Sequence, residues 1–256
     1  MKNETVEHGR PLEHLAPLGR IGLIALATDF NIESDLRRIY PGGIEIFTSR
    51  VLNINPLTIE NLRTMAPKIS SVAATLLPGT DLDAIIYACT SGTAAIGADR
   101  IQELIHQSCP NVPVINPIDA VCSAFEQFKA KRISILTPYT QSVNAELAAT
   151  FAARGYDILN ISGFAYEDDT AMTFISPEDI TEAAINTCDP DADLLFISCT
   201  ALRASLVIHD IEQQINKPVI SSNQALAWKT MQQVQHHIAI DGFGSLMQHS
   251  PNSNAQ

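Results

Sequence analysis

The hydrophobic residues of this chain gather in short continuous runs, and two of these runs are copies of one stretch. Residues 83–90 read Asp-Ala-Ile-Ile-Tyr-Ala-Cys-Thr, and residues 193–200 read Asp-Leu-Leu-Phe-Ile-Ser-Cys-Thr. A mostly apolar run of this length is typical of a strand that is buried on both faces of a parallel sheet. Each Cys-Thr pair then follows the carboxyl end of its strand, where open α/β sheets bind their ligands.

Two further segments also occur twice, at nearly the same spacing. Residues 20–28 are similar to residues 132–140, and residues 112–115 are similar to residues 217–220. The offsets are 112 and 105 residues, against 110 for the Cys-Thr strands. We infer a duplicated α/β chain. It forms two similar Rossmann-like lobes with parallel sheets, related by a pseudo-twofold axis, and the carboxyl ends of both Cys-Thr strands face one cleft.

This duplication predicts where the lobes begin and end. The first lobe is expected over residues 20–117, completed by a C-terminal helix over 224–237, and the second lobe over 118–223. Residues 1–19 and 243–256 are polar and are expected to be flexible tails.

Between the strands, the spacing of apolar residues predicts helices. Residues 58–77 and 93–105 each have the spacing of one continuous amphipathic helix. Residues 163–174 are polar and irregular, and we expect them to form a mobile flap.

The composition of the chain indicates which partners it can bind and in which cellular compartment it is expected. The net charge is −12 and no basic run occurs, which argues against nucleic acid. The longest apolar runs are too short to cross a bilayer, and the polar N-terminus has no signal-peptide pattern. Five cysteines without a secretion signal indicate reduced thiols in a cytoplasmic protein. Without a CxxC pair or a His cluster, no metal site is expected.

Two of the five cysteines stand out by their position. Cys89 and Cys199 both follow a strand and precede threonine. The small residues 90–93 can turn backbone N–H groups toward a ligand at a helix start, and such a position lowers the pKa of a cysteine. We therefore expect a thiolate at Cys89. The other three cysteines are interpreted as small buried hydrophobic residues: Cys109, Cys122 and Cys188.

Two facing thiols suit proton transfer at a carbon beside a carboxylate. One thiolate removes a proton from the substrate or adds to it, and the opposite thiol delivers a proton. Hydrogen bonds to the carboxylate must stabilise the carbanion. The candidate donors are polar residues at or near the strand ends: Thr90, Ser91, Thr200, Ser222 and Asn223. For Ser222 alone, helix capping is an equal alternative.

These motifs resemble those of a known superfamily. The matching segments are residues 88–91, 136–139, 167–169, 198–203 and 222–225. With them the chain resembles the aspartate/glutamate racemase superfamily, in the branch with maleate cis–trans isomerase and arylmalonate decarboxylase. Within this branch it looks most like the ectoine-utilisation protein A group. The resemblance extends over residues 20–228.

The resemblance implies a cofactor-independent enzyme in which Cys89 adds to a double bond, Cys199 acts as general acid and Tyr139 helps to hold a carboxylate. Decarboxylases of the branch keep only the second cysteine, so the presence of both favours an isomerase or racemase. The leading hypothesis is a two-cysteine racemase or isomerase of a small amino-acid-like carboxylate, in ectoine or hydroxyectoine catabolism, that works as a homo-oligomer. The alternatives are a maleate-type cis–trans isomerase, a decarboxylase, and a non-catalytic carboxylate-binding protein.

Two positions depart from this resemblance. Maleate isomerases have asparagines where this chain has Asp29 and Asp169. A carboxylate repels another carboxylate unless one is protonated, whereas it attracts an ammonium or amidinium. We therefore hypothesise a zwitterionic substrate. The alternative is that Asp29 caps the following helix and that Asp169 faces solvent.

Overall fold

The computed structural model describes residues 1, 3–11, 13 and 15–249 and contains two parallel four-stranded sheets. The strand order is β2-β1-β3-β4 in the first sheet and β6-β5-β7-β8 in the second. The strands of the first sheet are β1 (Gly19–Leu26), β2 (Ile44–Val51), β3 (Ala84–Ala88) and β4 (Val114–Ile115). Those of the second are β5 (Arg132–Thr137), β6 (Asp157–Gly163), β7 (Leu194–Ile197) and β8 (Val219–Ser221). The equivalent orders confirm two similar α/β lobes.

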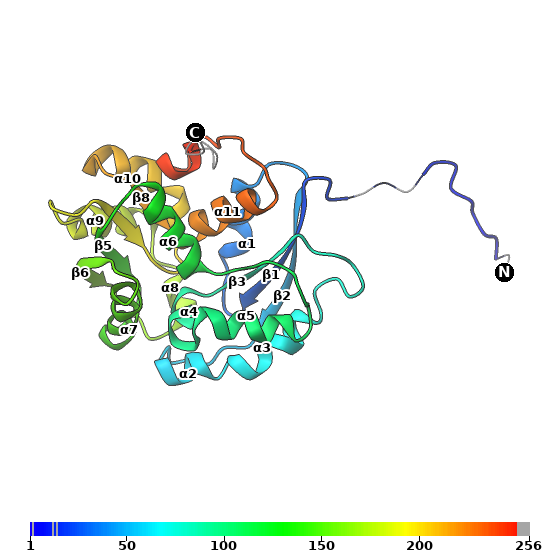
Figure 1. The fold of residues 1–256 in the computed structure, drawn as a ribbon, viewed down its shortest axis with the longest axis horizontal. Coiled ribbons are helices and arrows are strands. Elements are labelled where there is room, and N and C mark those ends of the chain that lie inside the picture. The colour runs from blue at the N-terminus through cyan, green and yellow to red at the C-terminus, as the bar shows by residue number, and fades with distance from the viewer. Residues whose placement is uncertain (2, 12, 14, 250–256) are drawn as a thin grey trace.

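Helices cover these sheets on both faces (Figure 1). In the first lobe α3 packs on β1 and β2, while α11 packs on β3 and β4 and against α1. The helices are α1 (Ile32–Ile39), α2 (Ile59–Arg63), α3 (Ala66–Ala73), α4 (Thr90–Ile96), α5 (Ala98–His106), α6 (Pro117–Gln127), α7 (Gln141–Ala152), α8 (Asp169–Met172), α9 (Pro177–Thr187), α10 (Ile208–Ile215) and α11 (Ser222–Gln233). No described helix is long and apolar enough to cross a membrane.

The repeated stretch forms the strands that its apolar run predicts. All five residues of β3 and all four of β7 are buried. The acidic residue at the start of each copy fixes the neighbouring strand: Asp83 accepts a hydrogen bond from the N–H of Arg20 (2.7 Å), and Asp193 accepts one from the N–H of Arg132 (2.8 Å). Both carboxylates therefore hold the amino ends of the sheets, opposite to the cysteines.

Two predicted helices are each divided in the structure. Residues 58–77 form α2 and α3 instead of one helix, because Pro67 lacks the N–H that would continue the hydrogen bonds of α2. Residues 93–105 fall into α4 and α5, separated by Gly97. Its φ of +97° is a backbone conformation that favours glycine.

The two ends of the chain differ from each other. The described residues before β1 are mostly exposed and extend away from the lobes (Figure 1). The prediction of a flexible tail is wrong for residues 243–249, where a 3₁₀ helix, Ser245–Gln248, buries Leu246 and Met247 against α11. Residues 250–256 of this predicted tail lie outside the described residues. The predicted helix over 224–237 is α11, which ends at Gln233.

The predicted flap over residues 163–174 lies against the first lobe. The N–H of Leu57 donates to the Glu167 carbonyl at 2.7 Å, and Asn55 Nδ2 donates to Asp168 Oδ1 at 2.8 Å. The rings of Phe30 and Phe174 lie 6.0 Å apart across the same junction. In this structure the segment therefore bridges the two lobes, and its mobility stays a prediction.

Candidate active site

Cys89 lies between the end of β3 and the start of α4, as the apolar pattern predicts. It is the N-cap of α4, and its sulfur accepts a hydrogen bond from the N–H of Gly92 at 3.1 Å. A Cβ on Gly92 would lie 2.8 Å from that sulfur and 2.9 Å from the Tyr87 hydroxyl. Glycine is therefore required here, because any side chain would displace the thiol.

Cys199 takes a different backbone conformation from Cys89. Its φ is +107°, while that of Cys89 is −151°. A positive φ costs a residue other than glycine about 1–3 kcal/mol and persists only where surrounding contacts enforce it. The N–H of Cys199 donates to Ser222 Oγ at 3.1 Å. The two repeats therefore place equivalent thiols on loops that are not equivalent.

Ser222 and the two threonines join the cysteine loops of both lobes. Ser222 Oγ lies 2.9 Å from Thr90 Oγ1, so it bonds to both loops. Thr200 Oγ1 donates to Asp29 at 2.8 Å and lies 3.3 Å from the Ala88 carbonyl oxygen. Ser221, and not Ser222, caps α11 through a capping box. The capping alternative for Ser222 is therefore wrong.

Tyr139 and Ser91 also lie at the thiols. Tyr139 follows β5, is 1% exposed, and donates a hydrogen bond to the Cys199 sulfur. Burial, with the nearby sulfur of Cys199, raises the pKa of Tyr139 well above its ordinary value, so this hydroxyl stays a donor. Ser91 Oγ lies 3.7 Å from the Cys89 sulfur. Each thiol thus has a hydroxyl beside it.

Asp29 holds the start of the following helix, close to the alternative that the sequence allowed, although the N-cap of α1 is Asn31. Its Oδ1 accepts the N–H groups of Asn31 (2.8 Å) and Ile32 (2.9 Å) at the start of α1, and its Oδ2 accepts from Thr200. Burial raises the pKa of Asp29, and the hydrogen bond from Ile32 opposes this shift. The carboxylate therefore fixes α1 and the second cysteine loop together.

Asp169 is buried, so the alternative that it faces solvent is wrong. It is 3% exposed, and its Oδ2 accepts hydrogen bonds from Thr28 and from Asn53 (3.3 Å) across the junction of the lobes. Burial raises the pKa of Asp169 to about 6, and the charge of Asp29 adds to this shift. Asp169 also acts electrostatically on both thiols.

The expectation of a thiolate at Cys89 is wrong for this structure, because the sulfur is buried. Burial raises the pKa of Cys89 to about 12, and the charge of Asp169 adds to the rise. The Gly92 N–H acts in the opposite direction but does not outweigh burial. Burial likewise raises the pKa of Cys199 well above its usual range. At neutral pH both sulfurs are therefore thiols, because burial disfavours the charged form.

Asn223 does not present its amide nitrogen to the thiols. Its Nδ2 donates to Asp35 Oδ2 and to the Thr200 carbonyl, both at 2.8 Å. Sequence reasoning missed Asp35, Asn31 and Tyr87. Asn31 could have been predicted, because it is a polar residue in the loop after the carboxyl end of β1. Nothing in the sequence indicates the buried hydroxyl of Tyr87, which has no hydrogen-bond partner.

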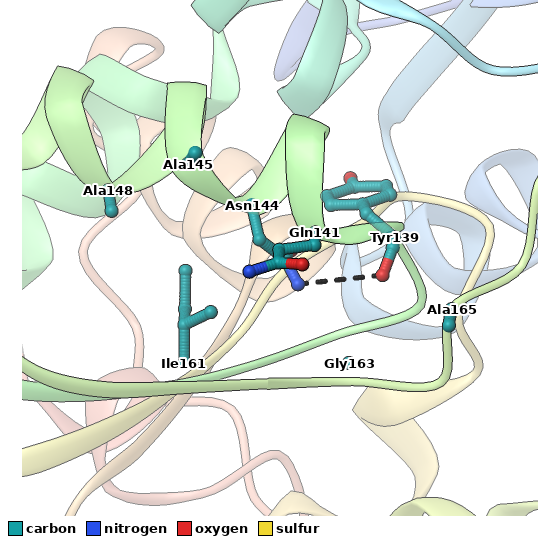
Figure 2. A pocket seen from close by; sticks show the side chains of 8 residues that line it. All are labelled: Tyr139, Gln141, Asn144, Ala145, Ala148, Ile161, Gly163 and Ala165. Carbon is teal, nitrogen blue, oxygen red and sulfur yellow. Dashed lines mark hydrogen bonds between the residues drawn. The ribbon is translucent and has the colours of Figure 1, made fainter.

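A cavity of about 470 Å³ lies between α7 and β6, beyond Tyr139 (Figure 2). Small side chains such as Ala145 and Ala148 line it, and Asn144 Nδ2 donates to the Tyr139 carbonyl at 3.5 Å. Neither catalytic candidate cysteine lines this cavity. Among the described residues, no group of three or more His, Cys, Asp or Glu could hold a metal ion.

Two similar lobes, each with a cysteine after a central strand, are the arrangement that the resemblance to the aspartate/glutamate racemase superfamily implies. The family model of arylmalonate decarboxylase matches residues 21–247. The chain belongs to this family, which confirms the resemblance at the level of the branch.

Relatives and solved structures agree with this assignment. The chain is 22% identical to the maleate isomerase of Nocardia farcinica over 89% of its length and 95% of the relative's. It is 23% identical to that of Alcaligenes faecalis over 73% and 74%. The fold is similar to a maleate isomerase variant from Pseudomonas putida S16 with maleate, with a TM-score of 0.83, 20% identity, and coverage of 90% and 97%. It is also similar to a Nocardia farcinica variant with a covalently bound succinylcysteine intermediate (TM-score 0.81, 19% identity, coverage 90% and 98%).

Proposed function

We propose that this protein is a cofactor-independent isomerase of a small carboxylate, with Cys89 as nucleophile and Cys199 as general acid. The observation that carries the proposal is that both cysteines are buried on loops that Ser222 links, by its contacts with Thr90 and with the N–H of Cys199. Relatives that are maleate isomerases support cis–trans isomerisation over the racemisation that the sequence favoured first.

The reaction begins from Cys89 as thiolate and Cys199 as thiol. The Cys89 sulfur forms a bond to one alkene carbon, and the π electrons move to the carbon beside the other carboxylate. Cys199 gives its proton to that carbon and becomes the thiolate. After rotation about the new single bond, the Cys199 thiolate takes the proton back, the C–S bond breaks, and the trans alkene leaves.

Forming the Cys89 thiolate is the demanding step. With a pKa of about 12, deprotonation at pH 7 costs about 7 kcal/mol for the buried sulfur. Contact of the sulfur with water lowers this cost, and the water accepts the proton that Cys89 loses. The N–H of Gly92 and the hydroxyl of Ser91 stabilise the thiolate as it forms. The Thr90 hydroxyl then serves as a donor to a substrate carboxylate, with Ser222 donating to it. To serve in the same way, Thr200 and Tyr139 must turn their single hydroxyl protons away from Asp29 and from the Cys199 sulfur.

NMR spectroscopy in deuterated water tests this proposal. With maleate, we expect fumarate to appear with the wild-type protein and not with the C89S variant. Deuterium at an otherwise unchanged stereocentre of an amino-acid substrate supports racemisation instead. Loss of a carboxylate supports decarboxylation. A protein that only binds carboxylates turns over none of these compounds. Its affinity for the carboxylate is then nearly unchanged in the C89S and C199S variants.

A second candidate is isomerisation or racemisation of an amino-acid-like carboxylate, related to ectoine or hydroxyectoine. The observation that favours it is the pair of buried carboxylates, Asp29 and Asp169, which both act on both thiols. A dianion such as maleate meets their negative charge, whereas an ammonium or amidinium is attracted to it. Including ectoine, hydroxyectoine and acetyl-diaminobutyrates in the NMR panel separates the two candidates. Turnover of maleate alone, at the rate of a dedicated isomerase, contradicts the second. A homo-oligomer in the cytoplasm stays a prediction.

A further inference from the structure

Side chains of the first lobe hold the loop that carries the second cysteine. Asn31 Nδ2 lies 2.9 Å from the Leu202 carbonyl oxygen and 3.2 Å from that of Thr200. Asn223 Nδ2, from α11, donates to the same Thr200 carbonyl at 2.8 Å. The carboxamides of Asn31 and Asn223 therefore hold the loop after Cys199 by its Thr200 and Leu202 carbonyls.

A single buried carboxylate joins these two carboxamides. Asp35, on α1, is 0% exposed, and its Oδ2 accepts from Asn31 Nδ2 at 3.0 Å and from Asn223 Nδ2 at 2.8 Å. On the other side Arg38 Nη1 lies 3.6 Å from Oδ1 and forms a partly exposed ion pair. None of these hydrogen bonds involves a thiol, so Asp35 acts through the amides.

The carboxylate decides which way the amides face. A carboxamide presents a donor at one end and an acceptor at the other. Only a group without protons to donate, such as a carboxylate, attracts the NH₂ ends of both amides to one point. With the NH₂ ends facing Asp35, both nitrogens also reach the loop carbonyls. A flipped amide, with its oxygen and nitrogen exchanged, would instead place its oxygen beside those carbonyl oxygens, where no hydrogen bond can form.

The held loop contains the strained residue. Cys199 has a φ of +107°, which persists only where neighbouring contacts over-determine it. We propose that Asp35 is a positioning residue for Cys199. It orients Asn31 and Asn223, which hold Thr200 and Leu202 and so keep the thiol in place beside Tyr139. Displacement of a reacting group by about 1 Å costs on the order of 10²-fold in rate.

Cysteine reactivity tests this positioning without reference to any substrate. We expect D35A to change the alkylation rate of Cys199 by iodoacetamide at least tenfold relative to wild type, while the rate at Cys89 stays within twofold. Peptide mass spectrometry reads both rates in one sample. D35N, which keeps one acceptor oxygen for the amides, is expected to show a smaller change. It also serves as the folded variant if D35A does not fold.

The matched control is D193A. Asp193 also holds backbone through hydrogen bonds, to the N–H groups of Lys131 and Arg132, but at the edge of the sheet opposite to Cys199. We expect D193A to lower stability without changing the ratio of the two alkylation rates. The same ratio in D35A, D35N, D193A and wild type would overturn the proposal. So would equal changes at both cysteines, which indicate general loosening.

A kinetic readout rests on the proposed function. Cys199 protonates the adduct, so we expect D35A to lower kcat about 10²-fold with KM within threefold, and to leave addition at Cys89 intact. If no turnover is found with any variant, the proposed function fails while the alkylation ratio still decides the role of Asp35. A loss confined to KM contradicts that role.

Discussion

Replacing Asp169 by asparagine is expected to stabilise the folded protein at alkaline pH, although the residue lies in the candidate site. Burial raises the pKa of Asp169 from 3.8 to about 6. The folded state therefore binds a proton more tightly than the unfolded state between these values. Stability from this group is highest below pH 3.8, falls as the pH rises, and is lowest above pH 6.

The size of the effect follows from this pKa difference. About 2 pH units at 1.36 kcal/mol each correspond to about 3 kcal/mol. Asparagine carries no charge and keeps an oxygen that accepts from Thr28 and Asn53. We therefore expect D169N to raise the free energy of unfolding by about 3 kcal/mol at pH 8 and to leave it nearly unchanged at pH 4.

Urea unfolding of both proteins at the two pH values measures the difference. D157N is the control, since Asp157 is exposed at the start of β6 and its loss should change stability by less than about 0.5 kcal/mol. If D169N is less stable than wild type at pH 8, the hydrogen bonds from Thr28 and Asn53 outweigh the cost of the buried charge, and the reasoning is refuted.

Three further predictions follow from the contacts in the cleft. Y87F should raise the free energy of unfolding by about 1 kcal/mol, because it removes a buried hydroxyl without a partner; a lower urea midpoint would contradict this. S222A should lower stability by about 1–2 kcal/mol and reduce turnover, since it breaks the bonds to Thr90 and Cys199; unchanged turnover in the NMR assay would show that the link is dispensable. Cys89 should react with iodoacetamide at pH 8 about 10³-fold more slowly in the native protein than in urea, because its pKa of about 12 lies three units above 9.0; equal rates would refute the buried thiol.

Much of the fold could be predicted because the repeat is a local signal. A continuous apolar run fixes a buried strand, and two matching runs fix two equivalent sheets, so the places of Cys89 and Cys199 followed directly. The boundaries inside helices were less predictable. Pro67 and Gly97 are residue types that interrupt helices, but the apolar spacing continues across both of them. A prediction from the spacing alone therefore joined each pair of helices.

The properties of the site depend on both lobes at once, and this limited the prediction. The pattern around Cys89 favours a thiolate, but burial of the sulfur outweighs the N–H of Gly92 at the helix start. The positive φ of Cys199 and the turn of Asn223 toward Asp35 arise from tertiary contacts between residues distant in sequence. A local sequence pattern cannot predict such contacts. It can predict the position of each cysteine, because that position depends only on where the strand ends.

Two thiols, one from each duplicated lobe, are proposed to act on one substrate. Intact-protein mass spectrometry of the C199S variant, incubated with maleate, tests this most directly. We predict that this variant gains the mass of one maleate, bound to Cys89, and that the C89S variant gains none. Equal labelling of both variants, or continued turnover by C199S at the wild-type rate, would contradict the claim.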